Sequence, residues 1–352
     1  MYIIDEIKAF LENNYPKPFA KFRLRQIEEA LFNFDNTGFS QISVLPLDIR
    51  NLLDANFAWL SLLEIRMFAS KNADTYKVLL KTEDKQLIES VLMKNKRGQW
   101  TICVSSQIGC AMGCTFCATG KMGLVRNLKA HEIYDQYRFW QLWLNKQMQD
   151  SKDLSTRVSN MVFMGMGEPL ANYDNVKLAI NKLLEYTDLG PTKITVSSVG
   201  VLTNLNRLLT DKDWPAVRIA ISLHSPEAIA RKKIVPTTIP GFHEKLITWS
   251  QDYAKAFRSR SHHVTYEYTL ISQVNDSAES AHELAGFIAK TAISKVNLIP
   301  LNPVVGTGFA TPDPLRIKKF KDVLRSYNID VTQRKTMGDD INAACGQLVA
   351  SN

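Results

Sequence analysis

The chain has 352 residues, of which 45% are hydrophobic and 22% are charged, and its formal net charge is +8. These values are ordinary for a soluble globular protein. No apolar run approaches the roughly 20 residues that span a bilayer. The first residues, MYIIDEIKAFLENN, carry acids and lack the small-residue cleavage site of a signal peptide. We therefore expect a cytoplasmic protein with no membrane partner.

The positive charge is unevenly distributed. Residues 1–95 hold 12 Lys and Arg against 13 Asp and Glu, so the remaining 31 basic and 22 acidic residues give a net charge of +9. Between Ser90 and His131 there are six basic residues and no acid. Such a positive field suits an anionic partner such as nucleic acid, although a solvated loop face has the same composition. A second basic group near the N-terminus comprises Lys17, Lys21, Arg23 and Arg25.

The first third of the chain predicts a small helical region followed by a hairpin. Apolar residues recur at helical spacing over residues 21–34, and residues 45–57 predict a second helix. Residues 76–82 and 86–94 are short apolar runs joined by a polar turn, which predicts a β-hairpin.

From residue 100 onward, short apolar strands alternate with amphipathic segments. We expect helices between the strands, for example over 131–148 and 280–291. Repeated βα units imply an α/β fold with a parallel sheet, and six units predict an incomplete (β/α)6 barrel. Ligands gather at the carboxyl ends of such strands, where the polar motifs of this chain lie. The expected strands are 101–106, 160–165, 193–198, 217–223, 264–270 and 295–300.

Four of the five cysteines lie within fifteen positions, which points to metal binding or catalysis rather than to a secreted disulfide framework. Cys110, Cys114 and Cys117 have the spacing C-x₃-C-x₂-C. Three such thiolates can hold three irons of a [4Fe–4S] cluster and leave the fourth iron open. A zinc site with three cysteines and one histidine also allows this spacing.

The sequence around these cysteines resembles a known family. The string CVSSQIGCAMGCTFCATGKMGLVRNL is followed in order by FMGMGEPL, ISLHSP, NLIPLNP and RKTMGDDINAACGQL. These motifs closely resemble those of the RlmN/Cfr family of radical S-adenosylmethionine (AdoMet) RNA adenine methyltransferases. The resemblance covers about residues 87–348. It implies a radical AdoMet partial barrel, one [4Fe–4S] cluster on Cys110, Cys114 and Cys117, and two AdoMet molecules per turnover.

The resemblance also implies a set of AdoMet contacts. A carboxylate such as that of Glu168 suits the AdoMet ammonium group, and a glycine lets the backbone approach closely. The same glutamate could instead cap a helix that begins at Pro169, and a lone Ser or His at a strand end is often structural. Their shared position at predicted strand ends favours binding. The implied contacts are Gly167, Glu168, Ser197, Ser222, Leu223, His224 and Asn302.

Three further residues match catalytic positions of the family. Cys345 matches a methyl-carrier cysteine, whose thiolate takes a methyl group from one AdoMet to become S-methylcysteine. A 5′-deoxyadenosyl radical from a second AdoMet then takes a hydrogen from that methyl, and the carbon radical adds to adenine. Cys103 matches the cysteine that assists product release by forming a disulfide with Cys345. Glu89 matches a glutamate suggested to accept a proton.

The residues alone leave plainer roles open for these three positions. Cys345 could be an inert buried thiol, Cys103 a core residue of its strand, and Glu89 a solvent-facing residue. Radical chemistry is nevertheless required if the target is C2 or C8 of adenine. Those carbons are electron-poor, so an ordinary methyl transfer would go to a ring nitrogen instead.

The implied substrate is an adenine in the peptidyl-transferase region of 23S rRNA, with an anticodon-loop adenine of tRNA as a second target. The base must be looped or flipped out to be reached. The string GMGEPL favours methylation at C2, whereas CATGKMGLVRNL shares features with the branch that methylates C8. The residues also allow a non-catalytic zinc-bearing RNA-binding protein, or a radical AdoMet enzyme with a substrate other than RNA.

We expect four parts along the chain. Residues 1–75 form a helical RNA-binding accessory domain, and residues 76–99 form a hairpin extension. Residues 100–335 form the partial barrel, and residues 336–352 form a C-terminal segment that carries Cys345. Cluster reduction requires a low-potential electron donor such as flavodoxin, and we expect the enzyme to be a monomer.

Overall fold

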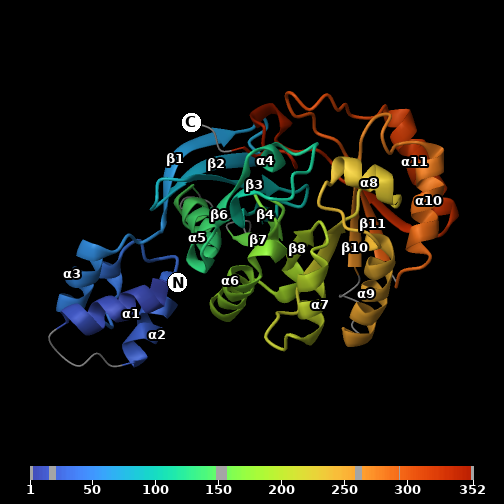
Figure 1. Cartoon of the computed structure of the whole chain (residues 1–352). Helices are drawn as coiled ribbons and strands as arrows, with labels where there is room; N and C mark the ends of the chain where they lie inside the picture. Colours follow the sequence, from blue (N-terminus) through green and yellow to red (C-terminus); the bar gives the residue numbers. More distant parts are fainter. Residues whose placement is uncertain (1–2, 16–20, 148–156, 258–263, 293, 350–352) are drawn as a thin grey trace.

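The N-terminal helices form a lobe at one end of the molecule (Figure 1). This computed structural model describes residues 3–15, 21–147, 157–257, 264–292 and 294–349. Lys17, of the N-terminal basic group, and Met148, the last residue of the helix predicted over 131–148, lie outside the described residues. Both predicted N-terminal helices are confirmed, as α2 and α3. The lobe comprises α1 (Ile3–Asn14), α2 (Phe22–Leu31), η1 (Phe39–Gln41) and α3 (Leu47–Asn56).

One ten-stranded sheet forms the body of the protein. Its order is β1-β2-β3-β4-β7-β8-β9-β10-β11-β12. Neighbours from β1 to β4 pair antiparallel, and neighbours from β4 to β12 pair parallel. The strands are β1 (Leu62–Ala69), β2 (Thr75–Thr82), β3 (Leu87–Lys94), β4 (Trp100–Cys103), β7 (Val158–Phe163), β8 (Ile194–Ser198), β9 (Arg218–Ser222), β10 (Val264–Leu270), β11 (Ser294–Pro300) and β12 (Asp330–Gln333).

None of the helices in the described part of the chain has the length and apolar character that crossing a bilayer requires.

Helices connect the parallel strands, as the alternating pattern predicts. The connecting helices are α5 (Ala130–Gln147), η2 (Pro169–Asn172), α6 (Tyr173–Tyr186), η3 (Pro191–Lys193), α7 (Leu202–Thr210), α8 (Ala228–Ile234), α9 (Phe242–Ala256), α10 (Ala278–Ile288) and α11 (Pro314–Ser326), and η5 (Asp339–Ile341) follows β12.

The six predicted parallel strands are present, and β12 adds a seventh. This strand, DVTQ, is four residues long and largely exposed, so no apolar pattern marked it. The predicted hairpin is confirmed as β2 and β3, but it continues the main sheet instead of extending away from it. Strand β1 lies inside the stretch expected to be helical, and most of its residues are exposed.

A small second sheet carries the start of the cysteine motif. Strand β5 (Gln107–Cys110) pairs antiparallel with β6 (Gly123–Asn127), and the short helix α4 (Ala118–Lys121) lies between them. At Gly109 the backbone φ is +72°, and a Cβ there would lie 1.8 Å from the Gly123 carbonyl oxygen. Glycine is therefore required at this position to close the hairpin.

Arg138 on α5 joins the N-terminal lobe to the sheet. Its buried guanidinium donates to the carbonyl oxygens of Leu31 at 2.8 Å and Trp59 at 2.9 Å, and it pairs with Asp135. The Asp135 carboxylate also accepts from the Ser61 amide at 2.7 Å. Removing the arginine would leave a buried carboxylate without its cation, which is strongly destabilising.

We expect Arg138→Met to lower the free energy of unfolding by about 3–5 kcal/mol, the usual cost of breaking a buried ion pair from one side. Urea unfolding monitored by circular dichroism measures this change. Arg25→Met is the matched control, because Arg25 forms an exposed pair with Glu29, whose loss costs less than about 1 kcal/mol. Equal losses for the two variants would contradict the assigned role of Arg138.

Candidate active site at the carboxyl ends of the parallel strands

Two adjoining cavities lie at the carboxyl ends of the parallel strands. The first, called here the cluster cavity, brings together Cys110, Cys114 and Cys117 with side chains from the ends of β8, β9 and β10. The second, called the carrier cavity, is lined by Cys103 at the end of β4 and by residues that follow β12. Cys345 lines both cavities. This thiol therefore lies at the boundary between them.

The three motif cysteines lie on one turn, residues 110–119, which is called here the cluster turn. Cys110 is the last residue of β5, and Cys117 directly precedes α4. Burial raises the pKa of the Cys110 thiol to about 12 and raises that of Cys114 further, with the neighbouring thiols adding to the effect. Thiols packed together in this way are poorly ionised until a cation compensates their charge, which is the expected property of metal ligands.

Glu168 is buried in the wall of the cluster cavity. One carboxylate oxygen accepts from the Val199 amide at 2.8 Å, and the other accepts from the Leu170 amide at 3.0 Å and so caps η2. Burial raises its pKa, and these hydrogen bonds oppose that effect. The capping role considered from the sequence is therefore real, yet the same carboxylate also lines the cavity.

Two serines and a histidine complete this wall. The hydroxyls of Ser197 and Ser222 lie 3.3 Å apart. The Nδ1 atom of His224 accepts from the Thr269 amide at 3.0 Å, and burial lowers its pKa to about 3. The imidazole is therefore neutral at physiological pH, with Nδ1 as the acceptor and Nε2 carrying the proton.

Two of the predicted AdoMet contacts, Leu223 and Asn302, do not line the cluster cavity. Leu223 is fully buried, its side chain does not line the cluster cavity, and its carbonyl oxygen accepts from the Arg231 guanidinium at 2.9 Å. Asn302 lines the carrier cavity instead. Its amide donates to the Cys345 carbonyl oxygen at 3.0 Å, and its Oδ1 accepts from the Thr336 hydroxyl at 3.0 Å. Asn302 thus fixes the backbone of the predicted methyl carrier.

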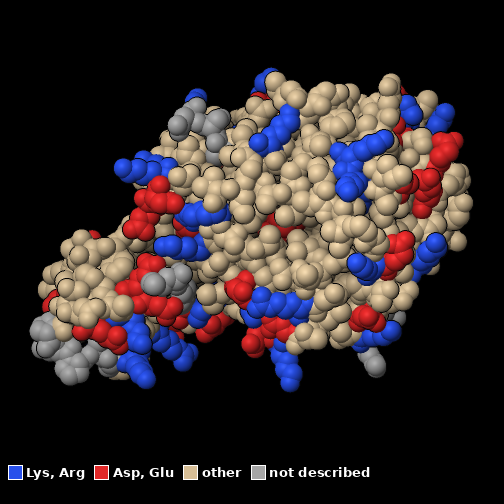
Figure 2. Space-filling view, viewed as in Figure 1, with Lys and Arg blue, Asp and Glu red and all other residues tan. Residues whose placement is uncertain are grey.

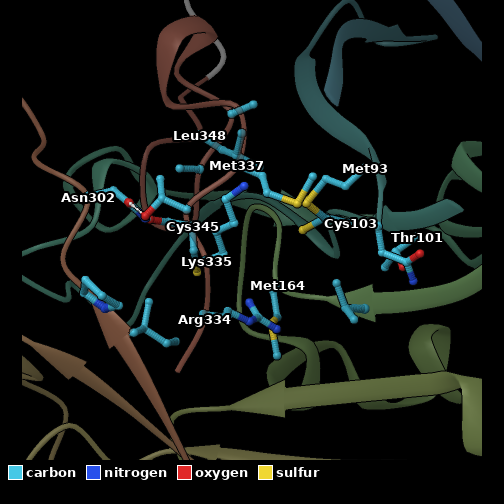
Figure 3. Close-up of a pocket in the computed structure, with 17 residues that line it drawn as sticks. Met93, Thr101, Cys103, Met164, Asn302, Arg334, Lys335, Met337, Cys345 and Leu348 are labelled. Atoms are coloured by element: carbon cyan, nitrogen blue, oxygen red, sulfur yellow. Dashed lines mark hydrogen bonds between the residues drawn. The ribbon is translucent and has the colours of Figure 1, made fainter. Parts of the chain in front are cut away.

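Figure 3 shows the carrier cavity with Cys345 and Cys103 on different walls. Cys345 is exposed to this cavity, and both thiols are free. The surrounding protein raises the pKa of Cys103 to about 12 and also raises that of Cys345. The guanidinium of Arg334, which lines the same cavity, lowers the pKa of both thiols. It is the cation that would favour a thiolate here.

Residues 338–349, called here the carrier segment, are held by three separate parts of the fold. The cluster turn contributes two hydrogen bonds, from the Ala118 amide to the Gly346 carbonyl oxygen at 2.8 Å and from the Thr119 hydroxyl to the Leu348 carbonyl oxygen at 2.6 Å. The end of β11 contributes Asn302. The antiparallel strands β1 to β3 contribute the third attachment, through the Lys71 amide, which donates to the Asp340 carboxylate at 2.9 Å, and through a buried ion pair.

Glu89 and Lys77 form that ion pair, with Oε1 and Nζ 2.8 Å apart and both side chains buried. The ammonium group donates to the Asn342 carbonyl oxygen at 3.2 Å, and the second carboxylate oxygen accepts from the Val349 amide at 2.9 Å. Burial raises the pKa of Glu89, which the ion pair and the amide oppose. In this conformation Glu89 lines neither cavity, because the carrier segment covers it.

The sequence interpretation missed two charged residues of the site. Glu267 lines the cluster cavity from β10, where it accepts from the Asn297 amide at 2.7 Å. Its signal was an acid inside the otherwise apolar strand VTYEYTL. Arg334 lies in a quoted motif, directly after β12. Because β12 was not predicted, Arg334 could not be recognised as a strand-end residue.

Comparisons with known proteins identify relatives over nearly the whole chain. Residues 104–285 match the family model of the Radical SAM superfamily. Ribosomal RNA large subunit methyltransferase N of Nitrosopumilus maritimus is 39% identical, covering 93% of this chain and 92% of the relative. The probable dual-specificity RNA methyltransferase RlmN of Carboxydothermus hydrogenoformans is 38% identical, covering 98% and 96%. The crystal structure of a radical SAM methyltransferase from Sphaerobacter thermophilus has a TM-score of 0.87 at 35% identity, covering 99% and 98%.

A parallel sheet with three cysteines on its first turn and a cavity at its strand ends defines a Radical SAM enzyme. Within that superfamily, the chain belongs to the RlmN family of RNA methyltransferases. The family expected from the five motifs is thereby confirmed. The alternative of a non-catalytic zinc-bearing protein is wrong, because the relatives that match almost the whole chain are methyltransferases.

The residues present fit the [4Fe–4S] cluster and AdoMet that this family implies. Within the described part of the chain, no three His, Cys, Asp or Glu side chains converge closely enough to share one metal ion. Cys110, Cys114 and Cys117 nevertheless line one cavity, and thiolates are the usual ligands of iron–sulfur clusters. Cys110, Cys114 and Cys117 would therefore hold the cluster, with the Glu168 carboxylate close enough to line the same space.

We expect Lys77→Met to loosen the carrier segment, because it leaves Glu89 buried without its cation. The rate at which iodoacetamide alkylates Cys345, followed by peptide mass spectrometry, should rise several-fold. Lys81→Met is the matched control, since Lys81 lies on the same strand and faces no buried acid in the described structure. An unchanged rate in Lys77→Met would show that the ion pair does not hold the segment.

Proposed function

We propose that this enzyme methylates C2 of adenine 2503 in 23S rRNA and of adenine 37 in tRNA. One observation carries the proposal: Cys345 lines both the cluster cavity and the carrier cavity, and Cys103 lines the carrier cavity with it. A thiol at this boundary can receive a methyl group on the cofactor side and present it on the substrate side. The second thiol is available to release the product.

In this proposal Cys345 is the methyl carrier. Its thiolate attacks the methyl carbon of AdoMet, so a new S–CH₃ bond forms while the sulfonium S–CH₃ bond breaks and S-adenosylhomocysteine leaves. Arg334 favours the thiolate, and Asn302 fixes its backbone. The Cys103 thiolate then attacks the Cys345 sulfur, so that the S–S bond forms while the bond from that sulfur to the methylene carbon breaks, and the carbon keeps the electron pair and takes up a proton as the methylated base departs. Both thiols are free in the resting structure, so the disulfide belongs to turnover.

The cluster and AdoMet, when bound, supply the electron and the 5′-deoxyadenosyl radical that remove a hydrogen from the carried methyl group. The chain supplies ligands and positioning. Glu168, Ser197, Ser222 and His224 surround the space beside the motif cysteines, as a polar molecule there requires. Gly167, with a backbone φ of +99°, also lines it.

Glu89 is proposed to accept a proton from the base after methyl addition. Lys77 favours its ionised form, which is the form that accepts protons. Because Val349 and the carrier segment cover the carboxylate, this role requires the segment to move away. Proton transfer and movement of the carrier are therefore linked steps.

The turn between β3 and β4 is proposed to contact RNA phosphates beside the carrier cavity. Met93 and Asn95 line the carrier cavity, and the neighbouring Lys96 and Arg97 are exposed. Arg126, another basic residue of the stretch between Ser90 and His131, already forms ion pairs with Asp84 and Glu132. In the N-terminal lobe, Arg23 and Arg25 are exposed enough to add further phosphate contacts, although each also bonds within the lobe.

We expect anaerobically purified protein to be brown and to contain about four irons per chain, as a [4Fe–4S] cluster requires. Replacing Cys110, Cys114 or Cys117 by Ala should abolish the colour and most of the iron, whereas Cys103→Ala should retain both, because Cys103 lies in the other cavity. Iron analysis and visible absorption measure this. Equal iron loss in all four variants would contradict the assigned ligand set.

The decisive experiment digests RNA that has been treated with the enzyme and analyses its nucleosides by mass spectrometry, separately for rRNA and tRNA. We expect 2-methyladenosine from both, and none with Cys345→Ala. Cys103→Ala should stop product release and leave a covalent protein–RNA adduct. Finding 8-methyladenosine instead would assign the enzyme to the C8 branch, and finding neither would refute the proposed reaction.

A further inference from the structure

Helix α8 presents a small apolar hollow flanked by lysines. Ile229 and Ile239 are 69% and 47% exposed, which is unusual for isoleucine, and both line the hollow. Lys232 and Lys233 line it too and are exposed. Figure 2 shows basic side chains gathered over α8 with uncharged surface around them. We call this hollow and its two lysines the α8 surface.

The α8 surface lies directly behind the cluster turn. The Thr115 amide donates to the Ile234 carbonyl oxygen at 3.0 Å, and its hydroxyl donates to the Lys233 carbonyl oxygen at 3.5 Å. Ile234 and Val235 pack with Cys114 and Phe116 in one buried apolar group. The backbone that carries the two lysines is therefore bonded to the turn that carries the motif cysteines.

The opposite side of the cluster turn faces the carrier segment. Ala118 and Thr119 bond to Gly346 and Leu348 there. The substrate base would enter by the carrier cavity, on that side. The α8 surface thus offers a second approach to the cluster that leaves the carrier cavity free.

Buried bonds hold the α8 surface in place. The fully buried Arg231 donates to the Val199 and Leu223 carbonyl oxygens and to the Thr238 hydroxyl. The acid at the start of the helix, Glu227, is occupied by the Ile229 and Ala230 amides. The two lysines therefore stand on a fixed frame, and neither forms a salt bridge in the described structure, although Lys233 is near enough to Glu227 to lower the pKa of that carboxyl.

We propose that the α8 surface docks a small acidic electron-transfer protein, which delivers the electron that the proposed function requires. Electron tunnelling weakens steeply with distance, so a donor must dock close to the cluster turn. Redox partners meet through small interfaces steered by opposite charges, and an apolar hollow between two lysines has that character. The transfer moves one electron and no atoms: the carrier protein is oxidised by one electron and the [4Fe–4S]²⁺ cluster is reduced to the 1+ state.

The test uses the complete, cluster-containing enzyme and reduced flavodoxin of low isoelectric point as the probe. In the variant Lys232→Glu with Lys233→Glu, we expect the Kd for flavodoxin, measured by fluorescence anisotropy, to rise about tenfold or more at low salt. RNA methylation driven by flavodoxin should lose a similar factor in kcat/KM for the donor. Methylation driven by dithionite, which needs no docking surface, should be unchanged.

The matched control is Lys318→Glu with Lys319→Glu, an exposed lysine pair on α11 that undergoes the same charge change. It should leave flavodoxin affinity within about twofold of the unmodified enzyme. A second variant, Ile229→Ser, tests the hollow without changing charge and should weaken flavodoxin binding by several-fold. Equal effects of the α8 and α11 pairs would overturn the proposal, because they would reflect net charge alone.

Two further results separate the docking of an electron donor from competing roles of this surface. If the α8 variant lowered RNA affinity in filter binding and lowered dithionite-driven methylation equally, the surface would belong to the RNA, and the proposal would be wrong. If the unmodified enzyme bound flavodoxin at this surface but methylated no RNA with either reductant, the proposed function would fail while the docking surface stood.

Discussion

The attachment of the carrier segment across the strand ends is the constraint on which the whole site depends. The sheet and the cluster turn alone provide four thiols, one from Cys103 on β4 and three from Cys110, Cys114 and Cys117, and leave the cavities open on one side. The carrier segment, from the other end of the chain, closes this open side. Its backbone carbonyl oxygens accept hydrogen bonds from Ala118, Thr119 and Asn302. Because these bonds fix the backbone around Cys345, they decide where its thiol lies relative to both cavities.

The Lys77–Glu89 pair adds a second function to the same attachment. In the proposed reaction Glu89 accepts a proton from the base, yet in this structure the carrier segment covers its carboxylate. Under that proposal, the position of the carrier segment would decide whether Glu89 holds the Val349 amide or accepts the proton. One buried ion pair links the β2–β3 hairpin, which the superfamily match at residues 104–285 does not include, to the segment that carries Cys345. The family-specific chemistry thus depends on parts of the chain outside the shared core.

The sequence predicted what local spacing controls. The βα alternation located six parallel strands, and C-x₃-C-x₂-C located the cluster turn. It did not predict β12 or the placement of β1 in the main sheet, because both are short of buried apolar residues. It could not predict that Glu89 would meet Val349, since that contact spans 260 residues of sequence. Local patterns carry no information on which distant segment covers a strand.

The carrier segment has an unusual backbone. Gly338, Asn342 and Gly346 all have positive φ, between 50° and 86°. At Gly338 a Cβ would lie 2.6 Å from the Thr75 side chain, so the turn there admits only glycine. Glycine adopts positive and negative φ about equally, so a segment bent at two glycines can change its course with little steric cost once its contacts break. Gly338 and Gly346, one on each side of Cys345, are therefore the places where the segment would bend if it moved away from Glu89.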